Sequence, residues 1–360
     1  MNQKSFCDFY KGKKVLITGN TGFKGAWMSR ILANMGAEVI GVALKPDTKP
    51  SLYEILSLKE DLKENIVDVR DFDKLKSIFE STKPDIVFHL AAQPIVIESY
   101  NNPRYTYDVN VMGTVNVCEC VRLTDSVKSF VNVTTDKVYR NLEREAPYSE
   151  EDVLDGHDPY SNSKSCSELV TASYRRSFYE EKSLPVSTCR AGNVIGGGDF
   201  ANYRIIPDCV RATVESKKIE IRNPNSVRPY QHVLEAVTFY LYIAMRQATD
   251  YRLRGEYNIG PNNSDCLTSK NVVELFCKYW GDDAAWEACD YKGPHEAKLL
   301  QLDTSKAKIF LKWKPVWTAS EAIEETVKWY KAFCSGNNMR KVTDEQIKRY
   351  LSLIEEKWGA

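Results

Sequence analysis

The sequence has no excess of charge of either sign and no long apolar run. Its 49 Lys and Arg residues balance 49 Asp and Glu residues, so no overall field attracts nucleic acid or an anionic membrane. No apolar run approaches the roughly 20 residues that span a bilayer, and the first residues lack the apolar centre of a signal peptide. We therefore expect a cytoplasmic protein with no nucleic-acid or membrane partner, in which local groups hold any anionic ligand.

Histidine is scarce and the cysteines are scattered. The chain has 4 His and 10 Cys, and the closest cysteine pair, Cys118 and Cys120, has neither a second pair nor a histidine nearby. This spacing matches neither a zinc site nor a disulfide framework. We expect no metal centre, and free thiols in a reducing compartment.

Short apolar runs alternate with helical patterns through the first half of the chain. The runs that predict buried strands are 13–18, 38–43, 66–69, 86–90, 129–134 and 186–190, and the patterns that predict helices are 25–35, 72–80, 110–121 and 160–178. Apolar strands between helices predict an α/β fold, a Rossmann-type doubly wound parallel sheet with helices on both faces.

This alternation stops after about residue 193, where glycine-rich and turn-rich segments separate shorter elements. We predict a dinucleotide-binding Rossmann domain at 1–192. Residues 193–360 are expected to form mostly a smaller C-terminal substrate-binding lobe that ends in a charged helical tail, with some segments returning to the first domain.

Glycines follow the first predicted strand with the spacing G-x-x-G-x-x-G. Glycine lets backbone amides approach a pyrophosphate at the start of the next helix. Such a turn can also be a simple helix–strand contact, but its place at the first strand–helix junction favours a dinucleotide site. The cofactor contacts we predict are Gly19, Thr21, Gly22, Phe23, Lys24 and Gly25, then Asp68 and Val69, then Ala91, Ala92 and Gln93, and finally Asn110, Tyr160 and Lys164.

The end of the second strand lacks the acidic residue that binds the ribose of NAD. Lys45, which stands there, is either a solvated loop charge or a contact for a 2′-phosphate. We expect NAD as the cofactor, and this element does not exclude NADP.

Tyr160 and Lys164 lie four residues apart, on one face of a predicted helix. A tyrosine with an ordinary pKa of about 10 is a poor base, but a nearby ammonium stabilises the phenolate. Tyr160 can then accept the proton of an alcohol as its hydride leaves. The same spacing occurs on plain helix surfaces, and the glycine turn upstream favours the redox pair.

Thr135, Asp136 and Lys137 follow the strand at 129–134, at the end where a parallel sheet presents ligand-binding groups. They are either a strand terminus with a helix N-cap or catalytic groups. If a sugar is oxidised at one carbon, its neighbouring C–H becomes acidic, and an acid with a base could then eliminate water.

Together these motifs resemble the extended short-chain dehydrogenases, in particular the nucleotide-sugar 4,6-dehydratases, and most of all the CDP-glucose group. The resemblance runs from about residue 10 to 335. Its blocks are 18–25 (TGNTGFKG), Lys137 after Asp136, 190–199 (RAGNVIGGGD) continuing into 204–208, 228–233 (RPYQHV), and 295–297 with 302–303. Asn20 departs from the histidine usual in this group, and Tyr230 from its tryptophan.

The resemblance implies a three-step conversion of CDP-D-glucose to CDP-4-keto-6-deoxy-D-glucose plus water, within deoxysugar biosynthesis. Tyr160, with Lys164 and Thr135, would take the proton of the 4-hydroxyl while hydride passes to NAD. Asp136 would protonate the departing C6 hydroxyl before hydride returns to C6. Lys137 would be the C5 base or would stabilise the enolate electrostatically.

The substrate contacts expected from these blocks are Asn193, Arg204 and Arg228, since arginine suits phosphate; His232 is either a further contact or a core histidine. A homodimer or a dimer of dimers would pair through the helices at 110–121 and 160–178. The alternatives are an epimerase or reductase on the same fold, a dehydratase for another nucleotide sugar, or a nucleotide-binding sensor.

Overall fold

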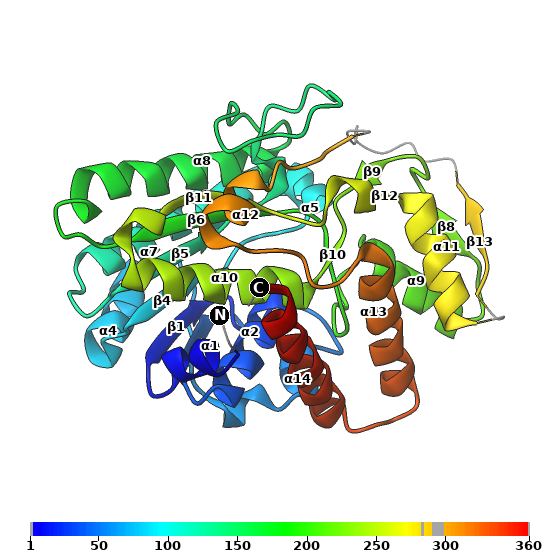
Figure 1. The fold of residues 1–360 in the computed structure, drawn as a ribbon, viewed down its shortest axis with the longest axis horizontal. Coiled ribbons are helices and arrows are strands. Elements are labelled where there is room, and N and C mark those ends of the chain that lie inside the picture. The colour runs from blue at the N-terminus through cyan, green and yellow to red at the C-terminus, as the bar shows by residue number, and fades with distance from the viewer. Residues whose placement is uncertain (1–2, 282–283, 290–298, 359–360) are drawn as a thin grey trace.

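The computed structural model describes residues 3–281, 284–289 and 299–358. Across these ranges the central feature is a parallel sheet of seven strands in the order β11-β6-β5-β4-β1-β2-β3 (Figure 1). The strands are β1 (Lys14–Thr18), β2 (Glu38–Ala43), β3 (Leu62–Ile66), β4 (Ile86–His89), β5 (Ser129–Val133), β6 (Val186–Ala191) and β11 (Gly255–Ile259). The predicted Rossmann-type α/β fold is confirmed.

Helices cover both faces of this sheet. Successive side chains of a strand point to opposite faces, so Val15 and Ile17 of β1 join one apolar core and Leu16 joins the other. The first core lies under α2 (Phe23–Asn34) and α10 (Val233–Thr249); the second lies under α4 (Phe72–Thr82), η2 (Asp108–Met112), α7 (Gly113–Arg122), α8 (Pro159–Tyr174) and η4 (Arg175–Tyr179). Burial on both faces explains why most strands are continuous apolar runs.

The third strand lies earlier than its predicted position. We expected it at 66–69, whereas β3 spans Leu62–Ile66. That prediction was wrong because β3 is the edge strand of the sheet, so its sequence LKENI is only partly buried and carries no apolar run. Asp68 and Val69 therefore belong to the link between β3 and α4, at the carboxyl edge of the sheet.

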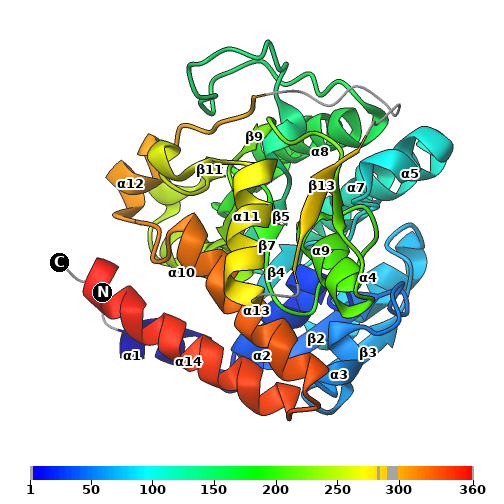
Figure 2. The same cartoon turned by 90° about the vertical axis from the view of Figure 1, so that its right-hand side faces the viewer.

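Two elements from the second half of the chain complete the sheet. Helix α10 packs on β5 and β6, and β11 pairs with β6. Beside the sheet lies a smaller group of elements that faces the viewer in Figure 2. It contains β8 (Ile219–Ile221), β9 (Val227–Arg228), β12 (Leu267–Thr268), β13 (Trp286–Ala288), α9 (Ile205–Val214) and α11 (Ser269–Trp280). The exact domain limits, 1–192 and 193–360, stay a prediction.

The last helices, α13 (Ala319–Cys334) and α14 (Met339–Trp358), return toward the start of the chain (Figure 1). Arg30 of α2 forms ion pairs with Asp344 of α14 at 2.6 Å and with Asp61 at 2.9 Å, which tie the two ends of the chain together. The remaining segments are α1 (Gln3–Tyr10), α3 (Leu52–Ile55), η1 (Leu58–Glu60), α5 (Val96–Asn101), α6 (Pro103–Tyr107), η3 (Asp136–Val138), β7 (Val194–Ile195), β10 (Gln231–His232), η5 (Tyr251–Leu253), η6 (Asn263–Asp265) and α12 (Ser305–Leu311).

Within the described ranges, no helix combines the length and the apolar character needed to cross a bilayer. The same residues hold no group of three or more His, Cys, Asp or Glu side chains that could bind a metal ion.

Candidate active site

A deep cleft follows the carboxyl ends of β1, β4, β5 and β6 and separates the sheet from the smaller group of elements. It encloses about 1430 Å³, more than the roughly 300–1,000 Å³ typical of a site for one small ligand. The volume is therefore large enough for two ligands side by side. All but three of the predicted site residues line this cleft, and the exceptions are Asn110, Asp136 and His232.

The glycine turn between β1 and α2 forms one wall of the cleft, and two of its glycines leave no room for a side chain. Gly19 has a φ of +76°, and a Cβ there would lie 2.7 Å from the backbone nitrogen of Ala91; a Cβ on Gly25 would lie 2.1 Å from the carbonyl oxygen of Gly19. Gly22 is the N-cap of α2 and provides no side-chain cap. The first amides of α2 are thus left to a ligand, as an anion site requires.

Asn110 supports the next wall from behind. It is buried, and its amide binds both backbone groups of Gln93, with Gln93 N donating to Asn110 Oδ1 at 2.8 Å and Asn110 Nδ2 donating to Gln93 O at 3.1 Å. Asn110 Nδ2 also donates to Ser163 Oγ at 2.9 Å. Asn110 thus holds the 91–93 loop against α8, and its role as a cofactor contact stays a prediction.

At the far end of the cleft the charges are mixed. Lys45 and Asp47 both line it, and Thr21 Oγ1 donates to Leu44 O at 2.9 Å, which fastens this loop to the glycine turn. Asp68, which follows β3, also lines the cleft. Its hydrogen bonds with Arg70 hold the pKa of its carboxyl below the usual value. A ribose bound at this end would therefore meet charges of both signs.

Tyr160 and Lys164 occupy the first two turns of α8. Asp158 caps this helix by accepting a hydrogen bond from Ser161 N at 3.0 Å, and Pro159 begins it. Lys164 Nζ donates to Val133 O at 3.1 Å. Burial lowers the pKa of Lys164 to about 8. Burial also raises the pKa of Tyr160, while the ammonium of Lys137 and a hydrogen bond with Thr135 act against that rise.

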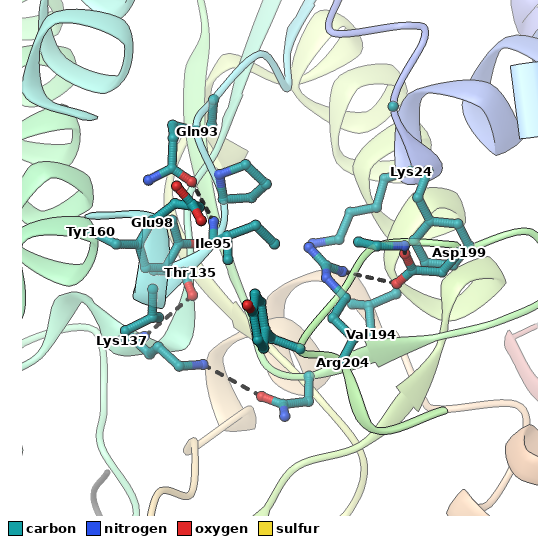
Figure 3. Close-up of a pocket in the computed structure, with 18 of the residues that line it drawn as sticks. Lys24, Gln93, Ile95, Glu98, Thr135, Lys137, Tyr160, Val194, Asp199 and Arg204 are labelled. Carbon is teal, nitrogen blue, oxygen red and sulfur yellow. Dashed lines mark hydrogen bonds and ion pairs between the residues drawn. The ribbon is translucent and has the colours of Figure 1, made fainter. Parts of the chain in front are cut away.

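The segment after β5 brings its three predicted residues together, and Figure 3 shows two of them, Thr135 and Lys137, in the cleft. Thr135 Oγ1 donates to Asp136 Oδ1 at 3.0 Å, and Lys137 Nζ donates to Asp136 Oδ1 and to Asn193 Oδ1, both at 3.4 Å. Thr135 is also the N-cap of η3. The helix N-cap expected as one of the two alternatives for this segment is therefore present. Asp136 is fully buried, and its Oδ2 has no partner among the described residues.

Cations gather where the glycine turn faces the start of α9 across the cleft. Lys24 of the glycine turn and Arg204 at the start of α9 lie close together in Figure 3, and Arg204 Nη1 is 3.1 Å from Asp199 Oδ2. Burial, together with the charges of Arg204, Lys164 and Lys137, lowers the pKa of Lys24 to about 7. A chain with no net charge thus concentrates positive charge where an anionic ligand would bind.

The two remaining predicted substrate contacts differ in position. Arg228 is buried and lines the cleft. His232 lies in the core between Trp27 and Trp317, with ring centroids 6.0 and 4.9 Å away, and its Nδ1 accepts a hydrogen bond from Leu234 N at 3.2 Å. Because it does not reach the cleft, the structure favours the core-histidine alternative.

Two cleft residues were missed from the sequence. Glu98 of α5 lies beside Gln93 and Tyr160 in Figure 3, and Asp199 orients Arg204. The sequence offered a clue to both, because Glu98 follows the predicted 91–93 loop and Asp199 ends the RAGNVIGGGD block. The motif at 295–297 lies outside the described residues.

Comparison with known proteins agrees with this geometry. A family model described as GDP-mannose 4,6 dehydratase matches residues 16–326. The chain is 45% identical over 351 residues to a CDP-glucose 4,6-dehydratase of Salmonella typhimurium, covering 96% of this chain and 98% of that protein. It is 26% identical to the dTDP-glucose 4,6-dehydratase of the same organism, covering 96% and 99%.

Solved structures share the fold. A dTDP-glucose 4,6-dehydratase from Bacillus anthracis in complex with NAD superposes with a TM-score of 0.74 at 23% identity, covering 92% of this chain and all of the other. The epimerase Mth375 from Methanothermobacter thermautotrophicus superposes with a TM-score of 0.78 at 23% identity, covering 94% and 97%.

A glycine turn, a Tyr-x-x-x-Lys helix and this parallel sheet together define the class of the extended short-chain dehydrogenases. The chain belongs to the GDP-mannose 4,6 dehydratase family. The resemblance to nucleotide-sugar 4,6-dehydratases predicted from the motifs is confirmed.

Proposed function

We propose that this chain is an NAD-dependent hydro-lyase that converts CDP-D-glucose to CDP-4-keto-6-deoxy-D-glucose. The observation that carries the proposal is that the Thr135–Lys137 segment lies beside Tyr160 in one cleft, joined by the Thr135–Tyr160 hydrogen bond. An oxidoreductase would need Tyr160 and Lys164 alone, whereas water elimination needs additional acid–base groups. The 45% identical relative supports CDP-glucose as the substrate.

The cleft fits a dinucleotide along its sheet side. The uncapped amides of α2 suit a pyrophosphate, and the crowded Gly19 and Gly25 allow the close backbone approach that such a group requires. The loops at 68–69 and 91–93 line the same side. Bound there, NAD would supply a store for the hydride that leaves the sugar C4 and is returned at C6, so that no net oxidation results.

Tyr160 acts first by accepting the proton of the sugar 4-hydroxyl. A buried phenol resists ionisation, but the ammonium of Lys137 favours its charged form and a hydrogen bond with Thr135 also lowers its pKa. Lys164, held by Val133 O, adds a second ammonium on the same helix face. Together these groups make phenolate formation feasible inside the cleft.

Asp136 and Lys137 act on the resulting ketone. The ketone makes the C5 proton acidic, and Lys137 either removes it as the neutral amine or, as the ammonium, stabilises the enolate while another base takes the proton. The acid form of Asp136 would provide the proton for the departing C6 hydroxyl, and C5 takes up a proton again when hydride returns to C6. Asp136 reaches the cleft through its hydrogen bonds to Thr135 and Lys137, since its carboxylate is itself buried. Holding one sugar among all these groups keeps each step within reach of the next.

The direct experiment incubates the protein with CDP-glucose and NAD and measures the mass of the product. A dehydratase yields a product lighter by one water with no accumulation of NADH. An epimerase leaves the mass unchanged, a reductase consumes reduced cofactor in proportion to product, and a nucleotide-binding sensor returns the substrate intact. Running dTDP-glucose and GDP-mannose in parallel tests the choice of base.

We propose that Asn193, Arg204 and Arg228 bind the substrate diphosphate from the opposite wall. Arg204→Ala should raise KM about 10- to 100-fold with a smaller effect on kcat, because a charge-assisted hydrogen bond to phosphate contributes about 1.5–3 kcal/mol. Steady-state kinetics with CDP-glucose measures this. The matched control is Arg211→Ala on the same helix, whose guanidinium is paired with Asp208; an equal rise of KM in both variants would contradict the assignment.

We also propose that the chain forms a homodimer through η2, α7 and α8, which pack side by side. Met112 and Leu169 are apolar yet 48% and 55% exposed on these helices. Leu169→Lys should shift the protein toward the monomer in light scattering coupled to gel filtration, because a buried unpaired charge opposes association. Ile309→Lys on α12, also at an exposed apolar position, should leave the mass unchanged; a monomeric wild type would refute the proposal.

A further inference from the structure

A buried ion pair lies behind the redox pair, and the proposed reaction does not use it. Glu168 Oε2 lies 2.9 Å from Arg190 Nη2, and both side chains are only 2% exposed. Glu168 follows Lys164 by one turn on the same face of α8, and Arg190 belongs to β6. The pair therefore connects the helix of the redox residues to the sheet.

Glu168 holds the start of the segment that carries the elimination residues. Its carboxylate accepts hydrogen bonds from Thr134 Oγ1 and, at 2.6 Å, from Thr188 Oγ1. Thr134 directly precedes Thr135, and its backbone nitrogen donates to Cys189 O at 2.9 Å. The first residue of the segment is thus bound to α8 and to β6 at once.

Arg190 holds the other end of that segment. Its Nη1 donates to Tyr139 Oη at 2.9 Å and to Glu150 O at 3.1 Å. Tyr139 Oη in turn donates to Asn258 Oδ1 of β11 at 2.6 Å. Thr135, Asp136 and Lys137 therefore lie between two anchors, Thr134 and Tyr139, that meet at one ion pair.

Stability alone gives little reason for such a pair. The cost of removing two charges from water roughly cancels their attraction, and well-packed apolar residues of similar size are often as stable. What an apolar pair would not supply is the directional bonding of Thr134, Thr188 and Tyr139. The contribution of the pair is therefore the position of the segment.

We propose that Glu168 and Arg190 are positioning residues that hold Asp136 and Lys137 in register with Tyr160 and Lys164, so that one bound sugar is oxidised and dehydrated without moving. This inference rests on the proposed dehydratase function. It also gives Glu168 a second effect through Lys164.

That second effect is electrostatic. Burial lowers the pKa of Lys164, and the carboxylate of Glu168 opposes this shift. The other titratable groups that face Lys164 are Lys24 on the glycine turn, which is repelled by it, and His89 on β4, whose pKa burial and Lys164 lower to about 3, so that it is neutral. Tyr160 precedes Lys164 by one turn on the same helix. Glu168 thus helps Lys164 to keep its proton.

The test is Glu168→Gln, followed step by step. Without the carboxylate the pKa of Lys164 falls, so Lys164 loses its proton at a lower pH. We expect the alkaline limb of C4 oxidation, measured as transient NADH absorbance in a single turnover, to move down by about one pH unit or more. We also expect elimination, measured as solvent deuterium incorporated at C5, to slow more than oxidation, so that NADH accumulates.

Two further variants separate positioning from loss of structure. Glu256→Gln removes another helix-to-sheet ion pair, the partly exposed Arg175–Glu256 at 2.5 Å, which joins η4 to β11; it should keep the pH profile and the ratio of the two steps. The double variant Glu168→Gln/Arg190→Met leaves no unpaired buried charge and should fold, yet should retain the shifted limb. A wild-type profile in that double variant overturns the proposal.

A readout without substrate distinguishes this inference from the proposed function. Titration of ¹³Cε-labelled lysine by nuclear magnetic resonance, with Lys164 assigned by its loss in Lys164→Met, reports its pKa directly. If the wild type shows no turnover of CDP-glucose, the proposed function fails, while a lower Lys164 pKa in Glu168→Gln still supports the link between these residues. An unchanged Lys164 pKa contradicts it whatever the enzyme assay shows.

Discussion

Tyr160→Phe should abolish C4 oxidation, lowering kcat by about 10²- to 10⁴-fold, the range expected for the loss of a positioned acid–base group. The phenol is buried, shares a hydrogen bond with Thr135 and lies near the ammonium of Lys137, so phenylalanine removes the proton acceptor with little change in packing. Rapid mixing with CDP-glucose and NAD should show neither transient NADH nor product.

The control for this variant is binding. Cofactor and substrate affinities, measured by calorimetry, should stay within a few-fold of the wild type, because the glycine turn and Arg204 are untouched. Product formation at a wild-type rate in Tyr160→Phe would show that another group takes the 4-hydroxyl proton. Loss of binding together with activity would mean that the variant reports a damaged cleft.

Lys137→Ala should separate the two chemical steps. C4 oxidation should persist, whereas elimination should fall by about 10²- to 10³-fold, the typical cost of losing one group that stabilises a developing negative charge. Oxidation should also require a higher pH, because removing the ammonium of Lys137 leaves burial less opposed and raises the pKa of Tyr160. Transient NADH absorbance and deuterium incorporation at C5 measure the two steps independently.

Rescue by added amines and a charge-preserving substitution distinguish the two possible roles of Lys137 in elimination. If Lys137 is the C5 base, added alkylamines should restore elimination in Lys137→Ala in proportion to their free-base concentration. If it stabilises the enolate, Lys137→Arg should retain much of the activity, since the charge remains. An unchanged elimination rate in Lys137→Ala would remove this residue from the mechanism.

The sequence predicted the buried strands and the helix face of the redox pair, because both follow from residue spacing within one segment. The apolar runs at β1, β2, β4, β5 and β6 identified buried strands because both faces of the sheet are covered, and the four-residue spacing of Tyr160 and Lys164 placed both on one face of α8. The edge strand β3 escaped detection because its partial burial leaves no apolar pattern.

Contacts between distant segments were not predictable in this way. Lys137 follows a strand end, yet its ammonium donates to Asn193, 56 positions further along the chain. His232 shares a motif with Arg228 but points into the aromatic core, because the chain turns between β9 and β10. The Glu168–Arg190 pair joins residues 22 positions apart through tertiary packing, and no sequence motif predicts it.

Because α10 and β11 lie late in the sequence, the sheet cannot be completed early in synthesis. The nucleotide-binding half of the sheet is translated first, but the face over β5 and β6 is covered by residues beyond 232, and the last strand pairs only when residues 255–259 are available. Such long-range closure slows folding and leaves apolar surface exposed in the meantime. The core over β5 and β6 therefore stays partly open until most of the chain has left the ribosome.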